Sequence, residues 1–190
     1  MSKTYLEEFY WYIFGESGII HTAEDATLLI SWISEVYEGK NILLKLLWKA
    51  TRDGFEADTF HQRCDDKGAT LSIVKSDKNK IFGGLATMSW KANRFVHDSS
   101  AFIFSLTHKT NHDKQVDKFN SMYSLPAYGP TFGAEYDIYI ANNRNKEACS
   151  TSNPHAYNLT TPGNEIKYYA KSRNFLVIEI EVYVLRTPDS

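Results

Sequence analysis

The stretch ATRDGFEADTFHQRCDDKG, residues 50–68, gathers residue types that can do chemistry. A cysteine beside a histidine and an acid can form a thiol nucleophile, with the histidine as base and the acid orienting it. His61 and Cys64 lie three positions apart, but Phe60 and Cys64 lie four apart and therefore share one face of a short helix. A thiol packed beside Phe60 is a small buried hydrophobe, and the acids that follow it disfavour a thiolate. We therefore predict that this cysteine is structural.

The same histidine and cysteine could also belong to a metal site. Together with Cys149 and His155 they make four potential ligands in two pairs. The second pair is separated by five residues, and neither pair has the Cys-x-x-Cys spacing that marks structural zinc sites. We therefore predict no metal and no cofactor.

Two pairs of carboxylates have the spacing of neighbours on one face of a strand. Glu135 pairs with Asp137, and Glu179 pairs with Glu181 in FLVIEIEVYVL, where the acids alternate with isoleucine and valine. This alternation is typical of a strand with one buried and one solvated face. Two such acids repel each other unless a cation, a backbone donor or a basic group of a partner lies between them, so a binding edge is the second interpretation. We take these four acids as candidate partner-binding residues, and a hydrolase that uses carboxylates near residue 135 stays an alternative.

The composition excludes several classes of protein. The chain has 190 residues and a net charge of −2, and its basic residues are scattered among acids instead of forming the stripe that nucleic-acid binding needs. Two cysteines make no disulfide framework, and no run approaches the ~18 apolar residues of a transmembrane segment. The start of the chain lacks the pattern of a signal peptide. We expect one globular domain with at most a short extension, in the cytoplasm, with no nucleic-acid partner.

Periodicity predicts the elements in the first third of the chain. Apolar residues at helical spacing predict an amphipathic helix over residues 3–14 and a second helix that begins at Thr22, where Asp25 completes a capping box. Residues 41–51 predict a buried strand, and residues 57–65 predict a short helix. Helices are therefore expected early in the chain.

After residue 70 the period changes to two, which predicts strands. Residues 81–90 contain Gly83-Gly84, which indicates a bulge or a close backbone approach. Residues 100–108, 135–141 and 175–185 predict further strands, while residues 109–134, with the turn-rich YGPTFG, and residues 142–164 read as loops. Early helices followed by strands indicate an α+β fold with antiparallel sheets.

Five ordered blocks carry a family resemblance: LLWKATRDGFEADTFHQRCDDKGATLSIVKS, KIFGGLATMSW, AFIFSLTHK, YGPTFGAEYDIYIA and SRNFLVIEIEVYVL. Over residues 21–185 they resemble the TLDc domain, which is found in oxidation-resistance proteins and nuclear-receptor-coactivator relatives. The resemblance implies two antiparallel sheets stacked as a sandwich, flanked by helices. We divide the chain into an N-terminal helical extension, residues 1–20, and a TLDc-like domain, residues 21–187.

The resemblance also implies structural roles for matching positions. They are Asp53 and Gly54 at a turn, Phe60, His61 and Cys64 on a packed helix face, Gly83 and Gly84 in a hairpin, Phe104 in a core strand, and Gly129, Pro130, Phe132 and Gly133 in the loop that leads to Asp137. Many family members have a histidine where this chain has Tyr136, so a role that depends on that histidine does not transfer.

For function, the resemblance implies a non-catalytic protein-interaction domain. Family members are linked to protection against oxidative stress and bind the vacuolar proton-pumping ATPase. We therefore expect a protein partner, with the peripheral subunits of that ATPase as the first candidate. A redox-protective protein that uses Cys64 or Cys149 is the alternative.

Overall fold

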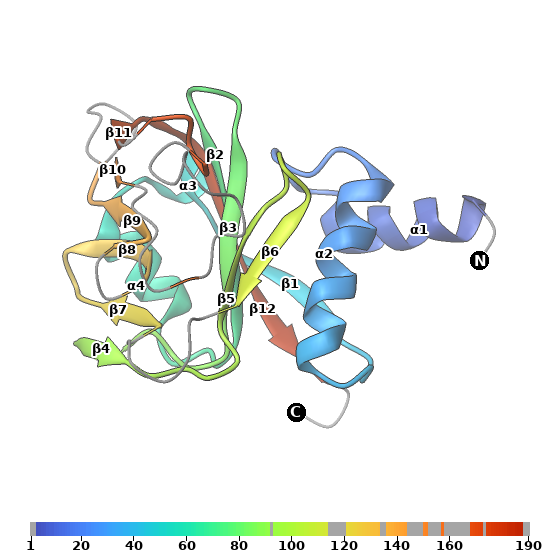
Figure 1. The fold of residues 1–190 in the computed structure, drawn as a ribbon, viewed down its shortest axis with the longest axis horizontal. Helices are drawn as coiled ribbons and strands as arrows, with labels where there is room; N and C mark the ends of the chain where they lie inside the picture. The colour runs from blue at the N-terminus through green and yellow to red at the C-terminus, as the bar shows by residue number, and fades with distance from the viewer. Residues whose placement is uncertain are drawn as a thin grey trace.

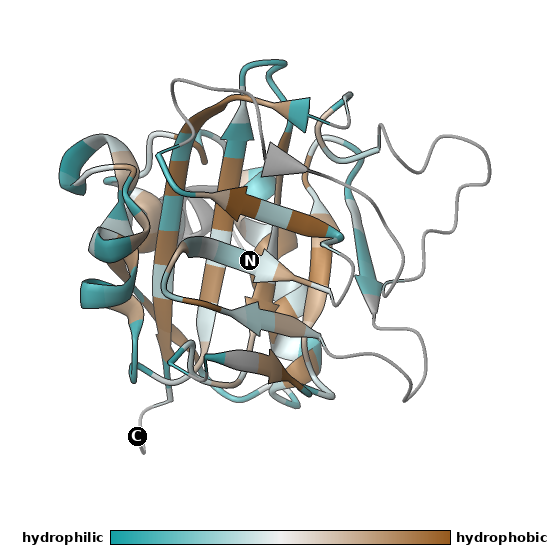
Figure 2. Cartoon of the chain, turned by 90° about the vertical axis from the view of Figure 1, so that its left-hand side faces the viewer, coloured by the Kyte–Doolittle hydropathy of each residue, from teal (hydrophilic) through white to brown (hydrophobic). Residues whose placement is uncertain are grey.

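Two six-stranded antiparallel sheets form the body of the molecule in the computed structural model (Figure 1). The structure describes residues 3–91, 93–113, 121–133, 136–143, 150–151, 157, 168–172 and 174–187. The predicted α+β sandwich is therefore confirmed. The strands of the second sheet run across those of the first, as Figure 2 shows from the side of the second sheet.

The first sheet is assembled from both ends of the chain. Its order is β1 (Leu43–Lys49), β12 (Val177–Arg186), β2 (Thr70–Ser76), β3 (Ile81–Ala86), β5 (Phe102–Ser105) and β6 (Thr110–Asp113). The second sheet has the order β11 (Asn174–Phe175), β10 (Ser150–Thr151), β9 (Ile138–Ala141), β8 (Tyr128–Phe132), β7 (Met122–Ser124) and β4 (Arg94–Val96).

Four helices accompany the sheets in the described part of the chain. Helices α1 (Lys3–Phe14) and α2 (Ala23–Val36) lie on the side of the first sheet that faces away from the second (Figure 1). The Thr22 side chain caps α2 by accepting from the backbone N–H of Asp25, as the sequence predicts. Helices α3 (Ala50–Asp53) and α4 (Ala57–Cys64) follow β1 directly.

Two hydrophobic clusters hold these layers together. One contains residues of both sheets and of α4, among them Trp48, Phe60, Trp90 and Phe132. The other joins α1 and α2 to the first sheet, and Tyr183 of β12 belongs to it. The first sheet is thus a middle layer that is covered on both faces. The division of the chain at residue 20 remains a prediction.

This middle position overturns the prediction of a solvated face on the last strand. Glu181 is 0% exposed and Glu179 is 5% exposed, whereas Ile178 is 50% exposed. The pairing of β12 with β2 shifts register between Val177 and Glu179, so Ile178 lies at an irregularity of the ladder. The predicted strand is confirmed as β12, but its acidic face lies against other parts of the chain.

The YGPTFG segment is also corrected, because most of it is a strand and not a loop. Tyr128–Phe132 forms β8, and its pairing with β9 shifts register between Tyr128 and Thr131. Pro130 lies within this irregularity, where the missing N–H of proline costs no regular ladder bond. Of residues 109–134 the structure describes 109–113 and 121–133, and most of these lie in β6, β7 and β8, so the prediction of a loop-rich region was wrong for them.

The glycine pair in β3 marks a close approach and not a bulge. The pairing of β2 with β3 is regular from Thr70 to Lys75. A Cβ atom on Gly83 would lie 1.9 Å from the carbonyl oxygen of Ser72, and one on Gly84 would lie 2.7 Å from the ring of Phe132. Gly84 therefore lets the second sheet pack against the first at this point.

Candidate functional site

The stretch that holds the cysteine and histidine forms α3, a turn and α4. Gly54 ends α3 with φ of 106°, a left-handed value that favours glycine. Asp53 accepts from the backbone N–H of Lys49 and from the guanidinium groups of Arg52 and Arg63. Hydrogen bonding from Arg52, followed by the Lys49 N–H, lowers the pKa of this carboxyl group. Asp53 thus fastens α3 to both β1 and α4.

Phe60 and Cys64 lie together in the core, on one face of α4. The Phe60 ring contacts the indoles of Trp48 and Trp90, each at a centroid distance of 5.4 Å. Cys64 is buried, and burial, followed by the charge of Asp65, raises the pKa of its thiol. A thiol of this kind is a poor nucleophile, so the structure gives no support to redox chemistry at Cys64. Cys149 lies outside the described residues.

We expect Cys64 to resist thiol reagents in the folded protein. In a Cys149→Ser variant, Cys64 is the one thiol left, and its reaction with an aromatic disulfide reagent can be followed by absorbance. The rate should rise by at least ~100-fold when guanidinium chloride unfolds the chain, because burial blocks both access and thiolate formation. A rate in native buffer close to the unfolded rate would show that Cys64 is accessible.

His61 connects α4 to the second sheet. Its Nδ1 lies 2.7 Å from Oδ1 of Asp65, and its Nε2 lies 2.8 Å from the carbonyl oxygen of Leu125 and 3.0 Å from that of Tyr128. Both ring nitrogens are therefore used in internal contacts. The arrangement fixes the position of the segment between β7 and β8.

Glu181 anchors the corner between α1 and α2. Its Oε1 accepts from the backbone N–H of Gly18 at 2.6 Å and lies 3.5 Å from Nζ of Lys49. Its Oε2 accepts from the hydroxyl groups of Ser17 at 2.5 Å and Tyr183 at 2.9 Å. The repulsion that the sequence predicts between neighbouring acids is thus offset by donors of the same chain.

Glu179 performs a similar role for α3. It accepts from the backbone N–H of Thr51 at 3.1 Å and from the Thr51 hydroxyl group. Asp137 is fully buried as well, and its Oδ1 accepts from the backbone N–H of Tyr157 at 3.1 Å. These acids therefore make internal contacts, and a role for them in partner binding stays a prediction. Glu135, the fourth acid of the predicted set, lies outside the described residues, as does His155.

The outer face of the second sheet carries a set of aromatic side chains that the sequence analysis missed. We call it the aromatic face; it consists of Phe95 on β4, Tyr123 on β7, Tyr128 on β8, Tyr139 on β9 and Tyr136 just before β9. Phe95 is 40% exposed, and the four tyrosines are half-buried. Phe95 stacks on Tyr123 at 4.1 Å. Figure 2 looks onto this side of the molecule.

A weak sequence signal for this face exists. Tyr139 lies between two buried isoleucines, and Tyr123 lies between two buried residues, as outward positions of a half-buried strand do. Short strands of three to five residues give this alternation little statistical weight. The order of the strands, which brings the five rings together, cannot be read from the sequence.

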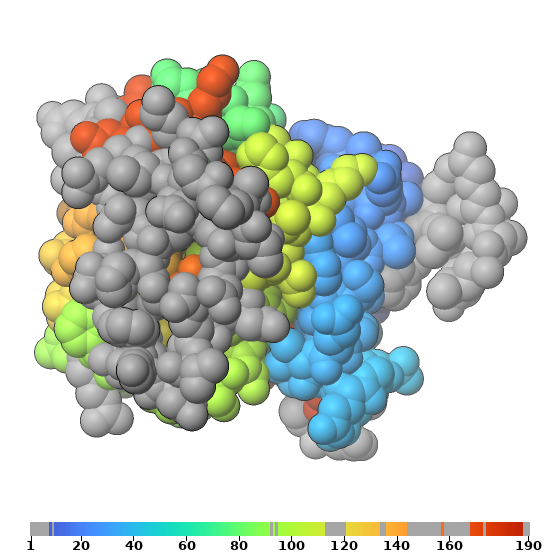
Figure 3. Space-filling view, in the orientation of Figure 1, coloured from blue at the N-terminus to red at the C-terminus, as the bar shows by residue number. Residues whose placement is uncertain are grey.

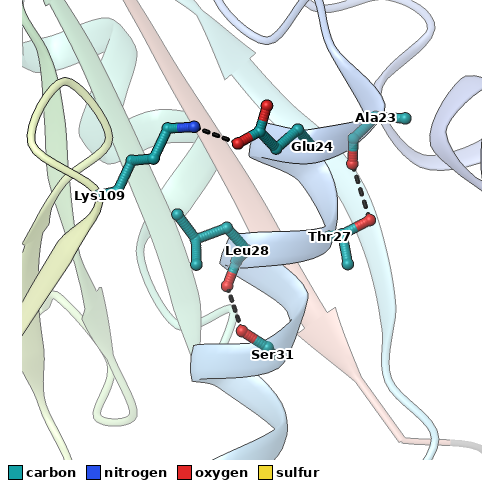
Figure 4. Close-up of a pocket in the computed structure, with 6 residues that line it drawn as sticks. All are labelled: Ala23, Glu24, Thr27, Leu28, Ser31 and Lys109. Atoms are coloured by element: carbon teal, nitrogen blue, oxygen red, sulfur yellow. Dashed lines mark hydrogen bonds and ion pairs between the residues drawn. The ribbon is translucent and has the colours of Figure 1, made fainter.

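A second surface feature is a groove between α2 and the turn that joins β5 to β6. These segments lie side by side on the surface, as Figure 3 shows in blue and yellow-green. The groove has a volume of about 520 Å³, and Figure 4 shows its lining residues. Lys109 pairs with Glu24 across it, Thr27 donates to the carbonyl oxygen of Ala23, and Ser31 donates to that of Leu28. Its polar groups are thus engaged with one another and do not converge on a ligand.

Helix α1 presents a third feature. Trp11 is 64% exposed and Tyr12 is 77% exposed, while Phe14 of the same helix is buried.

None of the helices in the described part of the chain has the length and apolar character needed to cross a membrane. Across the same residues, no three histidine, cysteine or acidic side chains are grouped so that they could hold a metal ion.

Parts of this chain are similar in sequence to known proteins. MTOR-associated protein MEAK7 of Xenopus laevis is 29% identical over 116 residues, which covers 50% of this chain and 25% of the relative. The protein of the same name from Danio rerio is 31% identical over 70 residues, which covers 36% of this chain and 16% of the relative. The chain thus matches a quarter or less of the length of these relatives. The family model of the TLDc domain matches residues 14–186, nearly the whole chain, which therefore belongs to the TLDc domain family.

Proposed function

We propose that the chain is a protein-binding domain that docks on the peripheral part of the vacuolar proton-pumping ATPase. The observation that carries this proposal is the aromatic face. Aromatic side chains gathered on an exposed sheet face are enriched at protein–protein interfaces, because they bury a large area at a small cost in side-chain entropy. On this proposal a contribution to oxidative-stress resistance follows from regulation of the pump, and the protein acts in the cytoplasm.

Family membership and the internal use of the acids support a binding role. Glu179, Glu181 and Asp137 are buried and hydrogen-bonded to other parts of the fold, so their geometry favours structural roles over acid–base catalysis. The named relatives are described as mTOR-associated, which is also an association with another protein. We propose that protein association is the activity that this chain shares with them.

Binding of the purified chain to the purified peripheral complex of the pump tests this proposal. We expect a dissociation constant at or below the micromolar range and a change in the ATPase rate of the complex. A mixture with the catalytic domain of an unrelated ATPase serves as the control for nonspecific association. Absence of binding at tens of micromolar would contradict the pump as partner.

A further inference from the structure

The four tyrosines of the aromatic face form a closed ring, which we call the tyrosine quartet. The centroid distances are 6.0 Å from Tyr123 to Tyr128 and 4.8 Å from Tyr128 to Tyr139. The circuit closes with 5.1 Å from Tyr139 to Tyr136 and 5.8 Å from Tyr136 to Tyr123. Neighbouring ring planes are inclined by 56° to 86°.

The backbone holds Tyr136 in an unusual conformation to complete this ring. Its φ is 65°, in the left-handed region that a bulky side chain rarely adopts. Its N–H donates to the carbonyl oxygen of Gly133, which itself has φ of 82°. A Cβ atom on Gly133 would lie 1.8 Å from Oδ2 of Asp137, so the turn closes tightly over the buried carboxylate. Backbone strain of this kind persists where the surrounding structure fixes it, and here it places the fourth ring.

The chemistry of the quartet suits a cation. The face of a tyrosine ring carries negative potential, and a cation within ~6 Å of a ring centroid is attracted to it. A group seated over the centre of the quartet lies within about 6 Å of all four ring centroids. Burial, followed by the proximity of Tyr128 and Tyr123, raises the pKa of Tyr136, so its phenol is neutral at physiological pH. Neutral phenols can accept hydrogen bonds from a seated cation.

Two exposed acidic side chains, Glu56 and Asp58, lie at the start of α4. His61 of α4 contacts the carbonyl oxygen of Tyr128, so α4 lies next to the backbone of β8 at this residue. Asp53, Asp65 and Asp66 pair with groups of the same chain, which leaves the negative charge of Glu56 and Asp58. This charge attracts a cationic segment and repels phosphate groups, so single-stranded nucleic acid, which also stacks on aromatic rings, is disfavoured.

We propose that the tyrosine quartet binds an arginine side chain of a partner protein. This inference deepens the proposed function, on which it rests, by naming the chemistry of the contact. Arginine fits better than lysine because its planar guanidinium stacks on aromatic faces and donates hydrogen bonds in its plane. The phenol oxygens at the rim of the quartet are the acceptors for those donors.

Short peptides test the site directly. The probe is acetyl-Gly-Arg-Gly-Arg-Gly-amide, and the control replaces both arginines with citrulline, which has nearly the same shape and no charge. Binding is followed by NMR shifts of the tyrosine rings. We expect the arginine peptide to bind at least about fivefold more tightly than the citrulline peptide, with the largest shifts at the quartet. Equal binding of the two peptides, or shifts confined to tyrosines outside the quartet, would overturn the proposal.

Variants separate the site from the fold. Tyr139→Ala removes a ring and should abolish the preference for arginine, whereas Tyr139→Phe keeps the ring and should retain most of it. Tyr136→Gly also removes a ring, but it relieves the unfavourable φ and should leave the thermal midpoint within a few degrees of the parent. Trp11→Ala, which removes an exposed aromatic ring on α1, should bind like the parent. Loss of the arginine preference in Trp11→Ala, or its retention in both Tyr139→Ala and Tyr136→Gly, would contradict the assignment.

The same variants distinguish a failure of this inference from a failure of the proposed function. If Tyr139→Ala and the parent bind the peripheral complex of the pump equally well, the quartet is not the docking site, while the proposed function stands. If the parent binds the arginine peptide but not the peripheral complex, the quartet stands as an arginine site and the pump is not its source.

Discussion

Replacement of Glu181 by alanine is expected to lower the free energy of unfolding by about 3–5 kcal/mol, the cost of removing one partner of a buried, hydrogen-bonded charge. The carboxylate is fully buried, and its two oxygens face Gly18, Ser17, Tyr183 and Lys49. Its loss leaves the Gly18 N–H and the hydroxyl groups of Ser17 and Tyr183 without this acceptor, whereas Lys49 still donates to the carbonyl oxygen of Glu16. The corner between α1 and α2 then loses its main polar link to β12.

Chemical denaturation with matched variants measures this effect. Glu35→Ala changes an exposed glutamate on α2 and should stay within about 0.5 kcal/mol of the parent. Glu181→Gln keeps the shape of the side chain and should fall between the parent and Glu181→Ala. A Glu181→Ala protein as stable as Glu35→Ala would show that the anchor contributes little.

Replacement of Gly83 by alanine is expected to destabilise the chain by about 3 kcal/mol or more, at the upper end of the range for overpacked cores. The added Cβ would lie 1.9 Å from the carbonyl oxygen of Ser72, a backbone atom of the neighbouring strand, and 2.8 Å from Cζ of Phe104. Because β2 and β3 are paired through this region, the backbone cannot move aside without breaking ladder bonds.

The neighbouring glycine provides the matched comparison. In Gly84→Ala the clash is with the ring of Phe132, a side chain that can be shortened. We expect Phe132→Leu to recover part of the stability lost in Gly84→Ala and none of that lost in Gly83→Ala. The denaturation midpoints of Gly83→Ala and Gly84→Ala, each with and without Phe132→Leu, test this expectation. If Phe132→Leu recovered the same stability in Gly83→Ala as in Gly84→Ala, the two glycines would not have the different neighbours that the distances indicate.

Local signals in the sequence identify most of the elements, because each depends on residues close together in the chain. The capping box at Thr22 and the turn pair at Asp53-Gly54 fix helix ends through neighbouring atoms. The last strand is visible from its alternation alone. YGPTFG misleads because glycine and proline are typical of turns, and a register shift within a ladder accommodates them equally well.

The candidate site is harder to predict, because it depends on which strands become neighbours. In the sequence Glu179 and Glu181 look like an exposed acidic face. In the structure they are buried, because the first sheet is a middle layer. The tyrosine quartet draws on three strands and one turn, and no pair of its residues is closer than three positions in sequence. Sequence periodicity places a tyrosine on a face, but only topology assembles the four rings.

Site-specific photo-crosslinking to the peripheral complex of the pump tests the central claim most directly. A benzophenone amino acid is placed at Phe95, on the aromatic face, or at Tyr12, a more exposed aromatic position on α1. We expect crosslinks to a pump subunit from position 95 and few or none from position 12. Crosslinks from position 12 alone, or from neither position, would contradict the claim that this chain binds the pump through its aromatic face.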